Sequence, residues 1–525
     1  MKRRDFLKYG SRGLVLPTLA GGFASKALGL SPLTAALNMV NETNHILVVI
    51  FMDGGNDGLN TVVPMDQYEN LQAVRPHVII PENKLLPLSG TNVALHPSMG
   101  KMRDLFNENR LQIIQNVGYP NPNFSHFRSS DIWMSGSDAD VVINSGWSGR
   151  YLNYEYPNFP EGYPNETNPH PLAVEIGWNT SLLFQGPSNP MSMVITEVDS
   201  FYDLVDEAGT GSDYPDTIVG DRLAYVNEIQ KQSQRYGEIV VDAAKKVTSQ
   251  QSYPDYYLAE QLKIVARLIA GGLQTRMYFV RIDGFDTHSG QVDGSDHTKG
   301  EHANLLHQLS ESVSAFVKDL DALNVSDRVM GMTLSEFGRR IVSNNSNGTD
   351  HGTAAPLFLF GNAVKGGVTG QNPIIDPNSN YEDNLDMQHD FRQVYSSVFD
   401  QWLCVDRDAL NQIFMSDYES LAVASSGTSC ITPTHEVNEQ AGVSYLNVNP
   451  NPAIDHLNIE FSGLGKPTFI SLHGLDGRLL KTVVNSHFPK GPHRLQLSLN
   501  GLPSGTYFLT YQTDSVRQSK QFVKL

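Results

Sequence analysis

The run His45-Ile46-Leu47-Val48-Val49-Ile50-Phe51-Met52-Asp53 decides the fold of this chain. It is apolar without interruption until the final acid, a pattern typical of a central parallel strand buried on both faces. The turn Gly54-Gly55-Asn56-Asp57-Gly58 follows directly. A strand of this kind places Asp53 at the carboxyl edge of a sheet, where ligands bind in open α/β folds.

Similar apolar runs recur along the chain, and segments with helical periodicity lie between them. Helical spacing of apolar residues is clearest in Tyr256–Gly271 and His302–Leu323. Strands alternating with helices predict an α/β fold with a mostly parallel sheet flanked by helices, which we place at residues 45–424. The further strand-like runs are Leu111–Val117, Pro171–Gly177, Arg276–Ile282, Arg328–Leu334 and Pro356–Gly361.

The composition changes after Ala424. Ser425-Ser426-Gly427-Thr428-Ser429 is typical of a linker, and we expect a polar linker over residues 425–442. Short alternating segments separated by Gly, Pro and Asp turns then fill residues 443–525, and their regular spacing predicts a small all-β, immunoglobulin-like sandwich. The expected strands are His456–Phe461, Thr468–Leu472, Leu479–Val484, Arg494–Leu499, Thr506–Tyr511 and Gln521–Leu525.

The length of 525 residues suits one large domain and a smaller one. A hydrophobic content of 40% and a charged content of 18% are those of a globular protein. The net charge of -18 disfavours nucleic-acid binding, because the phosphate backbone would be repelled. Cys404 and Cys430 either form a disulfide or remain two separate thiols, and their spacing is not that of a metal site.

The N-terminus reads Met1-Lys2-Arg3-Arg4-Asp5-Phe6-Leu7-Lys8, and an apolar stretch, Leu14–Phe23, follows before small residues. This order predicts a twin-arginine-type signal peptide over residues 1–28 and therefore an exported protein. The alternative is a basic tail on a cytosolic protein. Because the apolar stretch is short and contains Pro17, we expect no stable transmembrane segment.

Three short motifs place acids and imidazoles next to strand-like runs. They are Gly284-Phe285-Asp286-Thr287-His288, Ser335-Glu336-Phe337-Gly338 and Thr349-Asp350-His351-Gly352. Carboxylate oxygens and imidazole nitrogens on rigid strand ends suit a divalent zinc, manganese or iron ion. The alternative for each motif is ordinary turn or loop chemistry. The predicted metal ligands are Asp53, Asp286, His288, Glu336, Asp350 and His351.

Several of these residues have a second interpretation. Asp53 is alternatively a turn cap. Glu336 is alternatively the salt-bridge partner of Arg339 or Arg340, the two arginines that we otherwise expect to bind an anionic substrate. Asp350 either ligates the metal or holds a ligating histidine in place.

Ser125 and His126 are the candidate catalytic residues. They follow a Pro- and Asn-rich turn, and a helix is expected to begin there with Ser125 at or near the N-cap. A hydroxyl at that position faces free amides, which suits a nucleophile that carries an oxyanion. The alternatives are a capping serine and a structural histidine.

Together these segments resemble the domain-of-unknown-function family 1501, over most of Ile46–Leu403. That family looks like a distant member of the alkaline phosphatase, sulfatase and phosphomutase superfamily. The resemblance implies that Asp53 is the first acid, Ser125 the nucleophile and His351 the final histidine. The matching stretches are Val49–Pro64, Gly118–Gly136, Ser145–Leu152, Asp283–His288, Ser335–Arg340, Thr349–Val368 and Asp390–Leu403.

This chain differs in the second motif from the pattern that the resemblance implies. Asp286 and His288 fit the expected Asp and His pair, although their spacing is unusually short. Ser335-Glu336-Phe337-Gly338 stands where Ser-Asp-His-Gly is expected, so Phe337 replaces a histidine ligand. A second metal site would then be weak or empty. A sulfatase signature around Ser125 is also missing.

The tail resembles a type A C-terminal sorting domain of the type IX secretion system, over Val443–Leu525. This resemblance implies recognition by outer-membrane export and sorting machinery, and a final place outside the cell or on its surface after a periplasmic intermediate. The matching residues are Asn449-Pro450-Asn451-Pro452-Ala453, Leu472-His473-Gly474-Leu475-Asp476-Gly477-Arg478, Leu502-Pro503-Ser504-Gly505-Thr506-Tyr507 and Lys524.

The sequence therefore predicts a secreted metal-dependent hydrolase that acts on a phosphate or sulfate ester of a small molecule or glycan. One cation is expected on Asp286, His288 and His351, and a weaker one on Asp53 and Glu336. Paired cations stabilise the attacking and leaving oxygens of an in-line displacement. The alternative is a non-catalytic cell-surface binding or accessory protein on a degenerate hydrolase fold.

Overall fold

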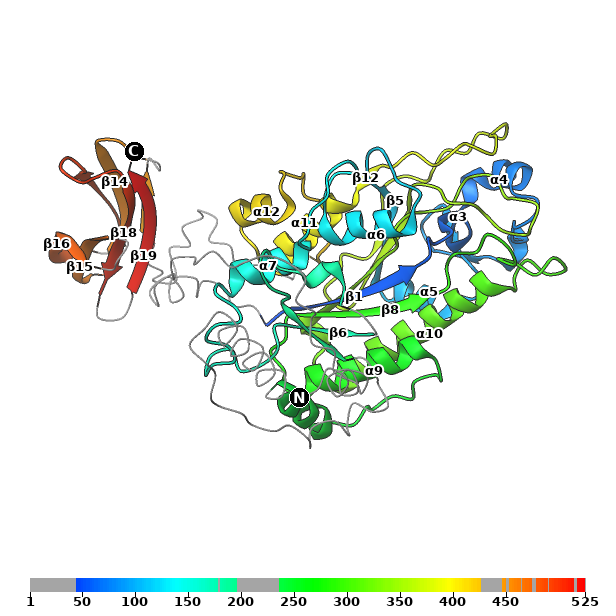
Figure 1. Ribbon diagram of the computed structural model, residues 1–525, viewed down its shortest axis with the longest axis horizontal. Coiled ribbons are helices and arrows are strands. Elements are labelled where there is room, and N and C mark those ends of the chain that lie inside the picture. Colours follow the sequence, from blue (N-terminus) through cyan, green and yellow to red (C-terminus); the bar gives the residue numbers. More distant parts are fainter. Residues whose placement is uncertain are drawn as a thin grey trace, which may run out of the picture. The chain divides into compact units, whose positions relative to one another are not determined.

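The computed structural model describes residues 44–177, 180–195, 236–425 and, apart from short gaps, 446–524 (Figure 1). These residues form two compact units, which lie within Asn41–Thr432 and Pro433–Leu525. The predicted signal segment lies outside the described residues, as does nearly all of the predicted linker. The domain boundaries therefore stay predictions.

The first unit is built on a nine-stranded sheet. Its order is β11 (Gly367–Thr369), β5 (Leu111–Gly118), β10 (Ala355–Phe360), β9 (Val329–Leu334), β1 (Ile46–Asp53), β8 (Met277–Asp283), β6 (Ala173–Ile176) and β7 (Ser192–Ile195), with β12 (His389–Asp390) beside β5. A separate small sheet contains β2 (Val62–Pro64), β4 (Val93–Leu95) and β3 (Leu86–Pro87). The mostly parallel α/β sheet is confirmed.

β10 is the exception to the parallel order, because it runs antiparallel to β5 and β9. The strands β8, β1 and β9 are parallel neighbours, with Asp53 opposite Asp283 in the register. Their carboxyl ends therefore lie at one edge of the sheet. Since β10 is reversed, its beginning lies at that same edge, which brings the residues before Ala355 there.

Helices cover both faces of this sheet (Figure 1). They are α5 (Gly100–Asn107), α6 (His126–Ser135), α7 (Trp147–Glu155), α9 (Tyr257–Ala270), α10 (Glu301–Ala322), α11 (Phe391–Gln401) and α12 (Arg407–Phe414). The short helices α3 (Gly58–Thr61) and α4 (Tyr68–Val74) instead share a separate hydrophobic cluster with residues of the small sheet. Short 3-10 turns occur at Met65–Gln67, Glu82–Lys84, Leu182–Phe184 and Ser326–Arg328. None of the helices in the described part of the chain has the length and apolar character that crossing a membrane requires.

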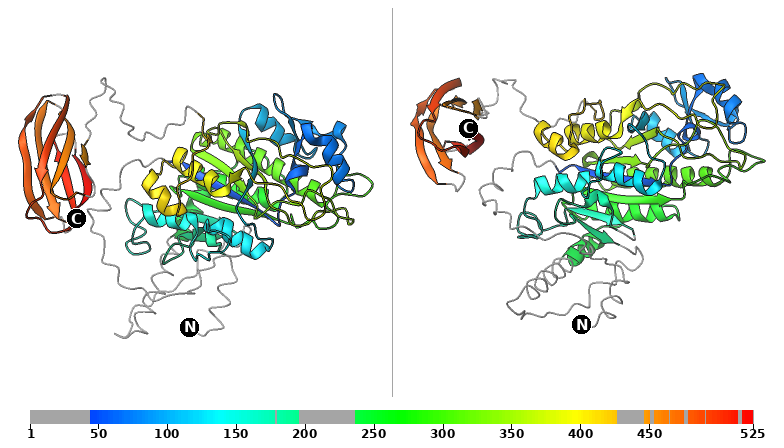
Figure 2. Two further views of the ribbon diagram at one scale, coloured as in Figure 1. Left: turned by 90° about the horizontal axis from the view of Figure 1, so that it is seen from above. Right: turned by 45° about the horizontal axis from the view of Figure 1, so that its top comes forward.

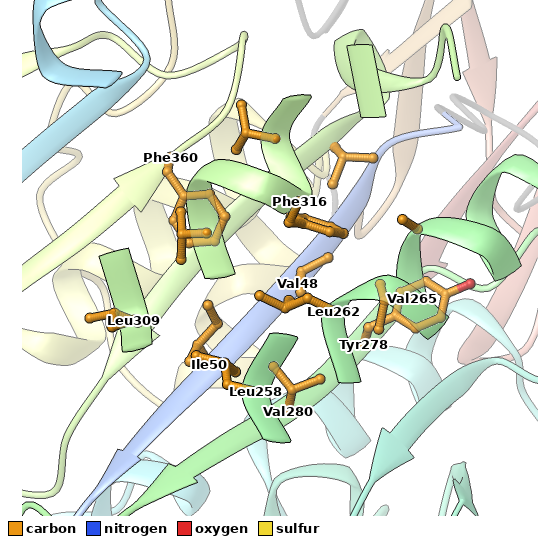
Figure 3. Packing of buried hydrophobic residues seen from close by; sticks show 14 of the residues in the cluster. Val48, Ile50, Leu258, Leu262, Val265, Tyr278, Val280, Leu309, Phe316 and Phe360 are labelled. Atoms are coloured by element: carbon orange, nitrogen blue, oxygen red, sulfur yellow. The ribbon is translucent and has the colours of Figure 1, made fainter. Parts of the chain in front are cut away.

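Alternate residues of β1 contribute their side chains to two different hydrophobic cores. Val48 and Ile50 face one core together with apolar residues of α9 and α10, as Figure 3 shows. Leu47 and Val49 face the opposite core, which contains residues of α6, α7, α11 and α12. All four side chains are fully buried, and each such burial stabilises the fold by about 1.5–3 kcal/mol. The apolar run of β1 thus fixes the middle of the sheet.

The second unit contains two antiparallel sheets, drawn in orange and red in Figure 2. One holds β13 (Leu446–Asn449), β14 (His456–Gly463) and β17 (Gly491–Ser498), and the other holds β16 (Leu479–Phe488), β15 (Lys466–Gly474), β18 (Gly505–Gln512) and β19 (Arg517–Lys524). Leu457 and Ile459 of the first sheet share a buried core with Leu472 and Leu509 of the second. The predicted all-β sandwich is confirmed.

Cys404 is disulfide-bonded. Cys430, the other cysteine of the chain, lies outside the described residues.

Candidate metal centre

The loops that follow β5 and β8, and the single connection between β9 and β10, converge at the carboxyl edge of the large sheet. The first begins α6 and supplies Ser125 and His126. The loop after β8 supplies Asp286 and His288, and the loop after β9 supplies Glu336. The same connection, shortly before β10, supplies Asp350 and His351. The topology therefore gathers the three motifs and the helix start into one place.

Three imidazoles surround the carboxylate of Asp286. The Nε2 atoms of His288 and His351 lie 3.2 and 3.3 Å from its Oδ1, and Nε2 of His126 lies 3.4 Å from its Oδ2. The Nε2 atoms of His288 and His351 are themselves 2.8 Å apart. Ligand atoms of His126, Asp286 and His351 all lie within 4.8 Å of one another.

Each of these histidines uses its other ring nitrogen to bind an oxygen acceptor. An acceptor at Nδ1 places the proton there and leaves Nε2 as a lone pair, which is the tautomer that ligates metals. Nε2 of His126 is buried and has no hydrogen-bond partner. The pairs are His126 with Glu336 Oε1 at 2.8 Å, His288 with Asp350 Oδ1 at 2.6 Å, and His351 with the carbonyl oxygen of Phe124 at 2.7 Å.

This donor set fits a divalent transition-metal ion. Lone pairs on neighbouring Nε2 atoms repel each other unless a proton or a cation lies between them. Three imidazoles and one carboxylate suit zinc, manganese or iron. A tetrahedral ion with bonds of about 2.0–2.1 Å has ligand atoms about 3.3 Å apart, close to the two distances from Asp286 Oδ1 to the Nε2 atoms of His288 and His351. The side chains of Asp286 and His288 are 48% and 44% exposed, so the centre is open to solvent.

The charges around the centre favour a cation. Burial alone would raise the pKa of Asp286, but the hydrogen bonds and charges of neighbours, Arg339 foremost, lower it to about 2. The hydrogen bond to Glu336 raises the pKa of His126 despite partial burial. Burial is the main cause that lowers the pKa of His351. The carboxylate that faces the histidines is thus held in its charged form.

Arg339 supports the centre from behind. Its side chain is fully buried, and every nitrogen of the guanidinium donates to an acceptor. It therefore does not face a substrate, in contrast to its predicted role. The acceptors are Asp286 Oδ1 at 2.8 Å, the carbonyl oxygens of Gly55 and Thr349 at 2.8 Å, that of Phe285 at 3.0 Å, and that of Gly54.

Arg340, the other arginine predicted to bind substrate, lies on the rim. It donates to Glu382 Oε2 and to the Tyr381 carbonyl oxygen, both at 2.6 Å. Its guanidinium also stacks on the rings of Phe124 and Tyr381, which are 40% and 48% exposed.

Two glycines let the loops approach each other. Gly54 has a φ of +120°, and a Cβ there would lie 2.3 Å from the backbone nitrogen of Asp286. A Cβ on Gly348 would lie 2.3 Å from the carbonyl oxygen of His288. Any larger residue at either position would push apart loops that carry candidate ligands.

Asp53 and Ser125 lie beside the cluster. The carboxylate of Asp53 pairs with Arg281, and its pKa is raised to about 6 because burial and the charge of Glu336 outweigh that arginine. Ser125 is the N-cap of α6, as predicted, but its side chain makes no capping hydrogen bond and is exposed. Its hydroxyl is therefore accessible next to His126.

A buried relay, defined as Arg75, Asp57 and Gln291, was not predicted from the sequence. Arg75 and Asp57 form an ion pair without solvent exposure, and Gln291 donates to the same Asp57 oxygen. Gln291 Oε1 accepts from Thr349 Oγ1 at 2.6 Å and from Thr287 Oγ1 at 3.3 Å. Arg75 also donates to the carbonyl oxygens of residues 340 and 341, at 3.0 and 3.2 Å. The relay thus contacts the loop after β8, through Thr287, and the β9–β10 connection, through Thr349 and residues 340 and 341.

The first unit is thus an α/β protein with a histidine and carboxylate cluster at the carboxyl edge of its sheet. Residues 207–392 match the family model described as a protein of unknown function, DUF1501, and residues 447–525 match that of a secretion system C-terminal sorting domain. Both resemblances seen in the sequence are confirmed. The sorting domain indicates secretion to the cell surface or the extracellular space.

Solved structures give a distant likeness. Ps i-CgsB in complex with k-i-k-neocarrahexaose is 10% identical, covering 80% of this chain and 83% of its own, with a TM-score of 0.32. A protein in the alkaline phosphatase superfamily from Vibrio parahaemolyticus is 7% identical, with coverages of 80% and 77% and a TM-score of 0.28. The PsFucS1 sulfatase from Pseudoalteromonas sp. is 10% identical, with coverages of 63% and 64% and a TM-score of 0.27. No curated protein matches the chain.

Proposed function

We propose that this chain is a secreted metal-dependent hydrolase of a phosphate or sulfate ester. The observation that supports it most directly is the convergence of three histidine Nε2 atoms on the carboxylate of Asp286. Each of these imidazoles is oriented through its Nδ1 atom, as in metal sites where an outer oxygen fixes the histidine.

In this proposal the cation is held by His126, Asp286, His288 and His351. His126 thus joins the ligands, although the sequence favoured a catalytic role. Glu336 and Asp350 orient histidines instead of binding the ion, since their oxygens accept from Nδ1 of His126 and His288. The arrangement therefore separates ligands from the groups that position them.

The bound cation would supply Lewis acidity toward an ester oxygen. Ser125 is the proposed nucleophile, because its exposed hydroxyl precedes a ligand histidine and lies at the N-terminus of a ten-residue helix. The free amides of that helix end would stabilise negative charge as the ester is attacked. The substrate class is a small-molecule or glycan ester with an anionic phosphate or sulfate group.

The test is elemental analysis of protein purified without added metal or chelator, followed by assays with p-nitrophenyl phosphate and p-nitrophenyl sulfate. We expect bound zinc, manganese or iron, and loss of both metal and turnover in His288→Ala and His351→Ala. The matched control is His307→Ala, since His307 is an exposed histidine of α10. A folded wild-type protein free of metal would overturn the proposal and favour a binding protein on a degenerate hydrolase fold.

A further inference from the structure

Four carboxylates surround the centre, and two arginines are paired with them. Asp53 pairs with Arg281, and Asp286 pairs with Arg339. The carboxylates of Glu336 and Asp350 have histidine partners, and among the described residues neither carboxylate forms an ion pair with an arginine. Arg281 also pairs with Asp283. The side chain of Asp283 is 66% exposed and therefore solvated, so its charge is left out of the balance below.

The charge balance of this group matches a single divalent cation. Four carboxylates against two guanidinium groups leave two negative charges when the histidines are neutral. Charges that are removed from water need compensation, because an unpaired ion in a low-dielectric interior is strongly unfavourable. One divalent ion neutralises the group, whereas two would leave it doubly positive.

Arg339 already contacts one carboxylate oxygen of Asp286. Its guanidinium contacts Asp286 Oδ1 and four backbone carbonyl oxygens of the motif loops and the first turn. Its side chain is completely buried, so these contacts are not exchanged with water. A fixed positive charge therefore already occupies the inner side of that carboxylate.

Phe337 closes the neighbouring space. Its ring lies 4.9 Å from the ring of His126 and 4.5 Å from that of His351, and a Cβ on Gly55 would lie 2.3 Å from it. The back of two candidate ligands is thus covered by an apolar ring. Glu336, which was expected to bind a second ion, is fully buried and accepts from His126 and from the backbone nitrogen of Gly54.

We propose that this centre binds one divalent cation and that the guanidinium of Arg339 takes the place of a second one. The inference rests on the proposed metal centre and replaces the expected weak second site on Asp53 and Glu336. In catalysis Arg339 is a positioning residue. It holds Asp286 charged and fixed, and it does not touch the substrate.

The test is the metal stoichiometry of the full chain, measured by elemental analysis and by calorimetric titration of the chelator-stripped protein with zinc. Phe337→His is measured in parallel, since it restores an imidazole beside His126 and His351 without touching Arg339. We expect one equivalent in the wild type and one equivalent in the variant.

Two equivalents in either protein would overturn the inference while leaving the proposed metal-dependent function intact. Zero equivalents in a folded wild-type protein would overturn the proposed function and this inference with it. If Phe337→His fails to fold, the wild-type stoichiometry decides alone, since one equivalent supports the inference and two contradict it.

Discussion

The substitution Glu336→Gln tests whether Glu336 binds the metal itself or only orients the proposed ligand His126. Glu336 is fully buried, and its Oε1 accepts from the backbone nitrogen of Gly54 at 2.9 Å and from His126 Nδ1 at 2.8 Å. A glutamine can keep its carbonyl oxygen in the same position. Both hydrogen bonds would then persist, while the negative charge and the long hydrogen bond that Oε2 accepts from Ser335 Oγ at 3.4 Å would be lost.

The magnitude follows from that geometry. A charge-assisted hydrogen bond is roughly twice as strong as a neutral one, so the loss at His126 is about 1 kcal/mol. We therefore expect the dissociation constant for metal to rise about five- to tenfold in Glu336→Gln. Glu336→Leu removes the acceptor altogether, so we expect a rise of about 100-fold. It also leaves the Gly54 N–H unsatisfied, which costs about 1–3 kcal/mol of stability.

The assay is competition for zinc against a chromophoric chelator, with urea unfolding of the same samples. The matched control is Glu382→Gln, an exposed carboxylate on the rim that pairs with Arg340, for which no change in metal affinity is expected. A complete loss of metal in Glu336→Gln, as severe as in His351→Ala, would show that Glu336 is itself a ligand. Unchanged affinity in both Glu336 variants would refute the orienting role.

Three further outcomes are expected. Ser125→Ala should lower the turnover of an ester substrate by at least about 100-fold while metal content, measured by elemental analysis, stays at the wild-type value. Gly54→Ala should destabilise the fold by about 3 kcal/mol or more in urea unfolding, because of its positive φ and its contact with the Asp286 backbone, whereas Gly90→Ala, which has a positive φ but open space, should cost only about 1 kcal/mol. Burial raises the pKa of Glu175 from 4.5 to about 7, so the folded chain holds that proton more tightly than the unfolded chain. Its contribution to stability is complete below pH 4.5 and is lost as the pH rises to about 7, by at most about 3 kcal/mol. Unfolding at pH 5 and pH 8 should show a smaller difference in Glu175→Gln than in wild type, and equal differences would contradict the assignment.

Much of the large sheet could be predicted because its central strands are buried on both faces. The apolar runs at His45–Asp53, Arg276–Ile282 and Arg328–Leu334 correspond to β1, β8 and β9 within one residue at each end. The antiparallel direction of β10 was not predicted, since periodicity reports burial and not direction. Strands as short as β11 and β12 have too few residues to show a pattern.

The candidate site was predicted in its residue types better than in its roles. Short motifs at strand ends suggested Asp286, His288 and His351 as ligands; the structure brings these side chains together, and their binding of a metal stays a prediction. The acceptor of His351 is a backbone carbonyl oxygen, and such a partner cannot be recognised from the sequence because every residue has one. The burial of Arg339 depends on carbonyl groups from several loops, and spacing along the chain cannot show how those loops meet.

The relay of Arg75, Asp57 and Gln291 has a consequence for the order of assembly. It joins the motif loops to one another through hydrogen bonds of buried side chains. Small zinc domains fold only when metal arrives, because the metal provides their core. Here buried hydrogen bonds between protein groups hold the loops, so under the proposed function we expect the chain to fold first and to bind a metal ion afterwards. For a secreted protein, loading would then depend on the supply of metal where the folded chain arrives.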